Sequence, residues 1–263
     1  MKPENNDERH EDGSAGDADY GAIGNRYSHY RRPEFRIASF IHKAFADAQT
    51  ILNVGAGAGS YEPANKVVTA VEPSISMRAQ RPEYLSRAID ATAEKLPFDE
   101  KSFDASMATF TVHQWRDLEA GLREMRRVTR GPVVILTCAP EEVANFWLNE
   151  YAPEVLSTEA RRYPPIDEIA KLIGNKVDVL PVPIPLNCVD GFNEAYYGRP
   201  EKFLDPGARQ SCSAWSFIDS QAAAKFEETL KSDLKEGLWD KKYGHLRSQP
   251  EYHGSLKLII GAP

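Results

Sequence analysis

The sequence is short of cysteine, of long apolar runs and of positive charge, and each shortage argues against a class of protein. Its 263 residues include three cysteines, Cys138, Cys188 and Cys212, an odd number without CxxC spacing. This favours free thiols in a reducing cytoplasm over a disulfide framework or a metal cluster. No His, Cys, Asp and Glu grouping has metal-ligand spacing, so we expect no metal.

No apolar run approaches the length needed to cross a bilayer, and the acidic, polar N-terminus is unlike a signal peptide. We therefore expect a cytoplasmic protein without a membrane partner.

Positive charge is outnumbered, with 32 Lys and Arg against 39 Asp and Glu. Residues 1–19 hold seven of the acids and two of the bases, so the rest of the chain, with 32 acids and 30 bases, is nearly neutral. Such a body lacks the basic face of a general nucleic-acid binder, and we expect no nucleic-acid partner. With almost no apolar side chains, residues 1–19 are predicted to be a disordered acidic tail.

The sequence does contain short apolar runs that alternate with helical patterns, which is typical of parallel β–α units. Helical patterns cover residues 74–80, 118–130, 143–151 and 166–173. The apolar runs predict strands at residues 50–54, 67–71, 87–90, 103–109, 133–137, 177–183 and 256–260. The expected architecture is an open α/β sheet with helices on both faces.

The strongest local signal is the loop NVGAGAGS after the first strand, in which Gly55, Gly57 and Gly59 alternate. Glycine permits positive φ and lets a ligand approach main-chain amides, although such a loop can also be a structural turn. The second strand ends at Glu72 and the third at Asp90. Loops at the carboxyl ends of parallel strands meet in one crevice, where an acid after the second strand typically binds ribose.

The glycine spacing disfavours NAD or FAD. Dinucleotide sites use G-x-G-x-x-G followed by a phosphate-facing helix, whereas this loop reads G-x-G-x-G and Pro63 follows closely. We expect a truncated helix before the second strand.

The stretches NVGAGAGS, AVEPSISM, IDATAEKLPFDEKSFDASMA, TVHQW and GLREMRRV follow one another over about residues 27–137. In this succession the sequence resembles class I S-adenosylmethionine-dependent methyltransferases of the type 11 group, which includes ubiquinone/menaquinone C-methyltransferases. The resemblance implies a Rossmann-like seven-stranded sheet with helices on both faces and a helical lid inserted before the last strand. It also implies S-adenosylmethionine as cofactor, S-adenosylhomocysteine as product, and a small-molecule acceptor methylated on O, N or C.

On this basis residues 20–263 are expected to form a single methyltransferase domain. Residues 20–48 would contain an N-terminal cap helix, residues 49–139 the cofactor-binding half, and residues 184–254 the lid insertion. The insertion, together with residues 147–163, is expected to select the substrate.

The resemblance further implies where the cofactor binds. The three loop glycines would approach its methionine part, Glu72 its ribose, and Ser74 or Met77 its adenine. Asp90 and Ala91 would meet the adenine amino group and edge. The complete set is Tyr27, Arg31, Gly55, Gly57, Gly59, Glu72, Pro73, Ser74, Met77, Asp90, Ala91, Thr109 and Phe110.

The roles of the N-terminal residues Tyr27 and Arg31 and of His113 stay open. Thr109 and Phe110 would border the methionyl end, while Tyr27 or Arg31 would either contact the cofactor or lie on the surface before the first helix. His113, in the loop after the fourth strand, is the leading candidate for a catalytic base, and a packing role is its alternative.

Three other functions remain compatible with the sequence. They are S-adenosylmethionine-dependent chemistry of another kind, methylation of a macromolecule, and binding without catalysis. The sequence identifies neither the acceptor nor the oligomeric state.

Overall fold

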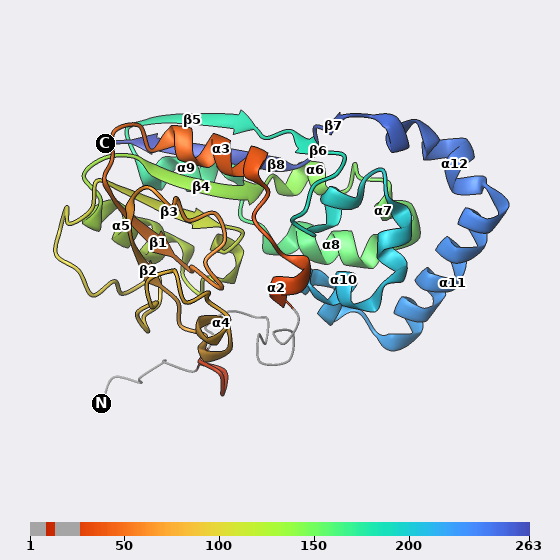
Figure 1. Ribbon diagram of the computed structural model, residues 1–263, viewed down its shortest axis with the longest axis horizontal. Helices are drawn as coiled ribbons and strands as arrows, with labels where there is room; N and C mark the ends of the chain where they lie inside the picture. Colours follow the sequence, from red (N-terminus) through yellow and green to blue (C-terminus); the bar gives the residue numbers. More distant parts are fainter. Residues whose placement is uncertain (1–8, 14–26) are drawn as a thin grey trace.

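The computed structural model describes residues 9–13 and 27–263, which are built around a six-stranded sheet (Figure 1). Its strand order is β2-β1-β3-β4-β8-β5, and β8 runs antiparallel to both of its neighbours. The strands are β1 (Thr50–Val54), β2 (Val67–Val71), β3 (Ala105–Thr109), β4 (Val133–Cys138), β5 (Lys176–Pro181) and β8 (Leu256–Ala262). The prediction of an α/β sheet with helices on both faces is confirmed.

Helices and 3₁₀ turns account for most of the remaining regular structure. In chain order they are α2 (Tyr27–Tyr30), α3 (Phe35–Ala44), α4 (Ile75–Ala79), η2 (Val112–Gln114), α5 (Leu118–Val128), α6 (Pro140–Val143), α7 (Leu148–Tyr151), α8 (Pro153–Arg162), α9 (Ile166–Ile173), η3 (Asn193–Tyr196), η4 (Pro200–Leu204), α10 (Pro206–Gln210), η5 (Ser213–Phe217), α11 (Ser220–Glu236), α12 (Leu238–Tyr243) and η6 (Gly244–Ser248).

The seven-stranded count was wrong by one strand. Residues 87–90 do not form a strand, since only Ile89 makes an isolated bridge, to Val71. Ile89 is 40% exposed. The segment therefore buries too little apolar surface to extend the sheet at its β2 edge. The predicted helix over 143–151 is also divided, into α6 and α7, and Trp147 between them donates a hydrogen bond from Nε1 to the Tyr197 carbonyl.

Alternate side chains of the strands enter two separate cores, one on each face of the sheet. Ile51 and Met107 pack on the face that α3 covers, together with Ile37. Leu52 and Ile135 pack on the other face, which α5 and α9 cover. This two-sided burial fixes the register of the strands and holds their carboxyl ends at one edge.

The loop between β1 and β2 contains turns and no helix, so even a truncated helix was an overestimate. Gly55, Gly57, Gly59 and Tyr61 all adopt positive φ, between 50° and 94°. Four such residues are incompatible with a right-handed helix.

The segment between β5 and β8 is mainly helical and lies beside the sheet, at the right of Figure 1. It also holds a small antiparallel pair, β6 (Ile184–Pro185) with β7 (Glu251–Tyr252). Its aromatic side chains form a core with Trp147, whose ring centroid lies 5.3 Å from that of Trp239 and 5.6 Å from that of Phe203.

The predicted acidic tail, residues 1–19, lies mostly outside the described residues. Within the described part, Arg9 forms an ion pair with Asp90 at 2.7 Å. Asp12 accepts hydrogen bonds from Ser74 and Ser76 at 2.7 and 3.0 Å.

All three cysteines are buried and free. In the portion of the chain that the structure describes, no helix is both long and apolar enough to cross a membrane. Across residues 9–13 and 27–263 there is likewise no group of His, Cys, Asp and Glu arranged to hold a metal ion.

Candidate functional site

The glycine loop lies at the carboxyl end of β1 and packs closely against the loop after β3. A Cβ atom on Gly55 would lie 2.1 Å from Oγ1 of Thr111, so only glycine fits there. At Gly57 the nearest atom to such a Cβ is the methyl carbon of Met77, at 3.2 Å. The loop thus presents bare main chain to the space beside it.

Glu72, which directly follows β2, is 7% exposed and holds the glycine loop in place. Its carboxylate accepts hydrogen bonds from the main-chain nitrogens of Gly57 and Ser74, at 2.7 and 2.9 Å. Burial raises the pKa of Glu72 above its ordinary value, against the lowering effect of these two hydrogen bonds. The glycine loop and the acid after β2 therefore form one unit.

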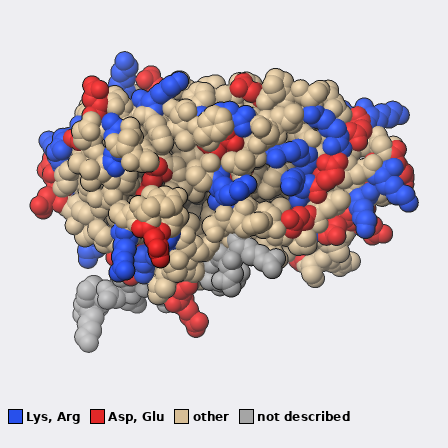
Figure 2. Space-filling view, in the orientation of Figure 1, with Lys and Arg blue, Asp and Glu red and all other residues tan. Residues whose placement is uncertain are grey.

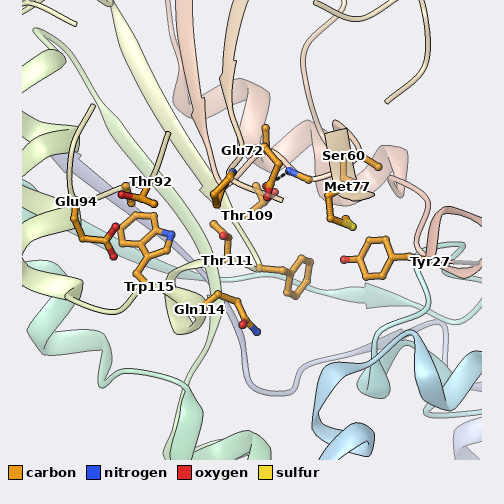
Figure 3. Close-up of a pocket in the computed structure, with 17 residues that line it drawn as sticks. Tyr27, Ser60, Glu72, Met77, Thr92, Glu94, Thr109, Thr111, Gln114 and Trp115 are labelled. Carbon is orange, nitrogen blue, oxygen red and sulfur yellow. Dashed lines mark hydrogen bonds between the residues drawn. The ribbon is translucent and has the colours of Figure 1, made fainter. Parts of the chain in front are cut away.

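A cavity of about 770 Å³ opens beside this unit, and we call it the first cavity. In Figure 3 Tyr27 and Met77 lie at one end, Thr92, Glu94 and Trp115 at the other, and Glu72 between them. Eight residues of the predicted cofactor set line it: Tyr27, Gly55, Gly57, Glu72, Pro73, Met77, Thr109 and Phe110.

The other five predicted cofactor residues lie outside this lining. Gly59 faces away, since a Cβ there would meet Leu85 and Arg81. Ser74 caps α4, accepting a hydrogen bond from the Met77 nitrogen.

The remaining three predicted residues have other surroundings. Asp90, with a side chain 54% exposed, forms ion pairs with Arg9 and Arg78. Ala91 is buried in the core beneath α5 and α9. Arg31 lines a second cavity, described below. Contact of these five residues with the cofactor stays a prediction.

Several lining residues escaped sequence reasoning. Thr92 and Glu94 follow Asp90 and Ala91, and Thr111 and Gln114 flank the candidate base in the TVHQW stretch. Because the predicted residues and the missed ones occupy the same two loops, the motifs located the loops correctly. Which side chain of each loop faces the cavity depends on the local backbone.

The second cavity, of about 520 Å³, adjoins the first, because Tyr27 and Phe110 line both. It also contains His113, Glu159 and Asn193, which come from η2, α8 and η3. Phe110, between the two cavities, has φ of 52°. Such a conformation is rare for a bulky residue and is concentrated at functional sites.

Arg31 connects the N-terminal segment to the insertion between β5 and β8. Its Nε donates to Asp190 at 2.6 Å, and Asp190 also accepts from the Tyr61 hydroxyl at 2.7 Å. The guanidinium carbon lies 5.0 Å from the ring centroid of Phe110 and 5.4 Å from that of Tyr27. The pair with Asp190 therefore orients Arg31 over the boundary between the cavities.

His113 lies against the Tyr163 ring, with centroids 4.7 Å apart. Burial lowers the pKa of His113 to about 3, and the charges of Arg162 and Arg31 add to this effect. The imidazole is therefore neutral at physiological pH.

The residues of the first cavity fit S-adenosylmethionine. The Glu72 carboxylate can accept hydrogen bonds from two ribose hydroxyls, and the glycine loop offers main-chain amides next to it. Tyr27 and Phe110 add aromatic side chains to the lining of the cavity. The fold and this site together define an α/β protein that binds a nucleoside-containing cofactor at the carboxyl edge of its parallel strands.

Comparison with known proteins narrows this class to a family. A family model described as "Methyltransferase domain" matches residues 52–136. A solved structure from Anabaena variabilis, described as a methyltransferase from an antibiotic biosynthesis pathway, is 30% identical with a TM-score of 0.82, and the match covers 88% of this chain and 98% of that one. The chain belongs to the class I S-adenosylmethionine-dependent methyltransferases, and S-adenosylmethionine is its cofactor.

Two further similarities are more distant. The demethylmenaquinone methyltransferase of Porphyromonas gingivalis is 28% identical over 174 residues, which are 56% of this chain and 69% of that protein. The YcgJ protein of Bacillus subtilis is 17% identical with a TM-score of 0.53, covering 87% of this chain and 97% of that one, and shows the fold alone.

Proposed function

We propose that this protein transfers the methyl group of S-adenosylmethionine to a small-molecule acceptor bound in the second cavity. The observation that carries the proposal is the shared boundary of the two cavities, formed by Tyr27 and Phe110. When bound, S-adenosylmethionine supplies an electrophilic methyl carbon on a positively charged sulfur. An acceptor in the adjoining cavity would lie next to that carbon.

The chain's own contribution is alignment and the exclusion of water. We propose that Glu72 holds the ribose and that Gly55 and Gly57 hold the methionine part, with Thr109 and Phe110 bordering its end. The other members of the predicted set remain part of this proposal. His113, neutral and inside the second cavity, is the base that the sequence suggests.

We propose that the parts of one domain enclose the site. Residues 20–263 would act as one domain, with residues 20–48 as a cap, 49–139 as the cofactor-binding half and 184–254 as a lid. Phe192 and Asn193 of the insertion line the second cavity, as does Phe110, which follows β3. We propose that the insertion and residues 147–163 select the acceptor, and that tail residues 1–19 are dispensable.

A small acceptor agrees with the visible surface and with the relatives. On the face that Figure 2 shows, Lys and Arg are interspersed with Asp and Glu, and this face has no continuous basic patch of the kind that binds a nucleic acid. The names of the two methyltransferases above refer to a quinone and to an antibiotic pathway, both concerned with small molecules. The three buried, free thiols support a cytoplasmic location.

The test is a metabolite screen for S-adenosylhomocysteine formation above the rate without acceptor. We expect turnover with at least one small molecule, and its loss when the glycine loop is blocked by Gly55→Val. The control variant Gly237→Ala adds a Cβ where no atom lies within 4 Å, and it should retain activity despite the positive φ of this residue. Methylation of protein or RNA in a cell extract, with no small molecule accepted, would contradict the proposal.

A further inference from the structure

The second cavity contains a partly buried carboxylate that the sequence analysis did not single out. Glu159, on α8, lines the cavity and accepts a hydrogen bond from the Asn193 amide at 2.8 Å. Burial raises the pKa of Glu159 above its ordinary value. A carboxylate in such surroundings is a better proton acceptor than one in water.

Positive charge surrounds this carboxylate. Arg31 and Arg162 line the same cavity, and both lie close enough to lower the pKa of His113. Arg162 donates a hydrogen bond to the Ser213 hydroxyl at 2.8 Å. This bond holds the Arg162 side chain against the insertion, to which Ser213 belongs. Two guanidinium groups stabilise an oxygen that becomes negative and oppose an ammonium group in the same space.

The walls of the cavity are aromatic. Phe110 and Phe192 pack against each other in a tilted arrangement with centroids 5.2 Å apart, and Tyr163 packs edge-on against His113. Flat rings of this kind suit a planar ligand.

Building on the function proposed above, we propose that the acceptor is a planar compound with an acidic hydroxyl, a phenol or an enol, and that Glu159 receives the hydroxyl proton. The O–H bond breaks as its proton passes to a carboxylate oxygen of Glu159. The oxygen electron pair forms the new bond to the methyl carbon, and the pair of the broken carbon–sulfur bond stays on sulfur. Arg31 and Arg162 stabilise the oxygen as its charge develops.

His113 is the rival proton acceptor in this cavity. A base works best when its pKa is near the working pH, and His113 is held far below it. Glu159 is shifted in the useful direction, and Asn193 fixes one of its oxygens. We therefore infer that Glu159 accepts the proton and that the His113 ring only lines the cavity.

The experiment uses three ligands of one shape: para-nitrophenol, para-nitroaniline and nitrobenzene. Each is titrated into the full-length protein saturated with S-adenosylhomocysteine, by calorimetry and by absorption below the pH at which free para-nitrophenol ionises. We expect the phenol to bind about tenfold more tightly than the other two, as one hydrogen bond to a charged group predicts, and to show the phenolate band when bound.

Glu159→Gln keeps the side-chain shape and an oxygen for Asn193, and should lose the phenolate band. Glu154→Gln, an exposed change of the same charge on the same helix, should retain it. With an accepted phenol as substrate, Glu159→Gln should lower turnover by about 10²–10⁴-fold, and the control Glu154→Gln should not.

The outcomes separate this inference from the proposed function. Failure of the folded protein to bind S-adenosylhomocysteine would remove both. Cofactor binding with equal affinity for the three ligands, with a preference for the amine, or with no ligand bound would overturn the inference alone. So would a phenolate band that survives in Glu159→Gln. The comparison of the three ligands uses the wild-type protein alone. It therefore tests the inference even if the Glu159→Gln protein misfolds.

Discussion

Replacement of Glu72 tests the cofactor site most directly. This carboxylate is 7% exposed and accepts main-chain hydrogen bonds from Gly57 and Ser74 at 2.7 and 2.9 Å. In the proposed complex it also accepts from the ribose hydroxyls. Glu72→Ala removes all these interactions, so its effects on folding and on cofactor binding have to be separated.

The size of the effect follows from the loss of a charged acceptor. A hydrogen bond to a charged group contributes about 1.5–3 kcal/mol, which corresponds to an increase in Kd of roughly 10- to 150-fold. The two main-chain N–H groups that lose their partner cost about 1–3 kcal/mol of folding stability each. For a chain of this size, each kcal/mol lowers Tm by roughly 2–4 °C.

The assay is calorimetric titration with S-adenosylhomocysteine, accompanied by thermal unfolding without ligand. Glu72→Gln retains an acceptor oxygen and should have an intermediate affinity, while Glu83→Ala, an exposed change in the following loop, should bind like the wild type. A folded Glu72→Ala protein with unchanged Kd would refute the assignment of Glu72 to the ribose.

Three further predictions concern other parts of the molecule. Asp104 accepts hydrogen bonds from the Gln49 and Thr50 nitrogens, which with Arg130 hold its pKa well below the ordinary value. The ionised Asp104 carboxylate therefore stabilises the folded state above the unfolded-state pKa of about 3.9, and this stabilisation is lost as the pH falls. In urea unfolding, Asp104→Ala should be less stable than the wild type by about 1–3 kcal/mol at neutral pH, and the difference in stability should shrink in acid. Asp190→Asn weakens the ion pair that orients Arg31, so KM for the acceptor should rise more than the Kd of S-adenosylhomocysteine, and an equal change in both would contradict this. Deletion of residues 1–19 should leave methyl transfer intact, while deletion through Arg31 should impair it; equal activity of the two truncations would remove the N-terminal segment from the site.

The sequence predicted the fold class because its signals are local. Apolar runs of strand length alternate with helical patterns. Both apolar faces of a sheet built from such strands must be covered by helices, which defines the fold class. The prediction failed where burial in the tertiary structure decides whether a segment becomes a strand or a helix. Residues 87–90 resemble a strand, yet Ile89 lies at an exposed edge and pairs only once. The same limit applies to the helix predicted over 143–151, which breaks so that Trp147 can enter the aromatic core.

The sequence by itself determined the family, the cofactor and two of the loops that line the first cavity, the glycine loop and the loop after β2, since glycine spacing and an acid after a strand are constraints on neighbouring residues. Only the tertiary structure placed Glu159 beside Asn193, 34 residues away, and Arg31 beside Asp190, 159 residues away. Contacts between distant segments depend on how helices pack on the sheet, and no local pattern encodes that packing. The second cavity consists of such contacts, and the chemistry proposed for it could therefore be read only from the fold.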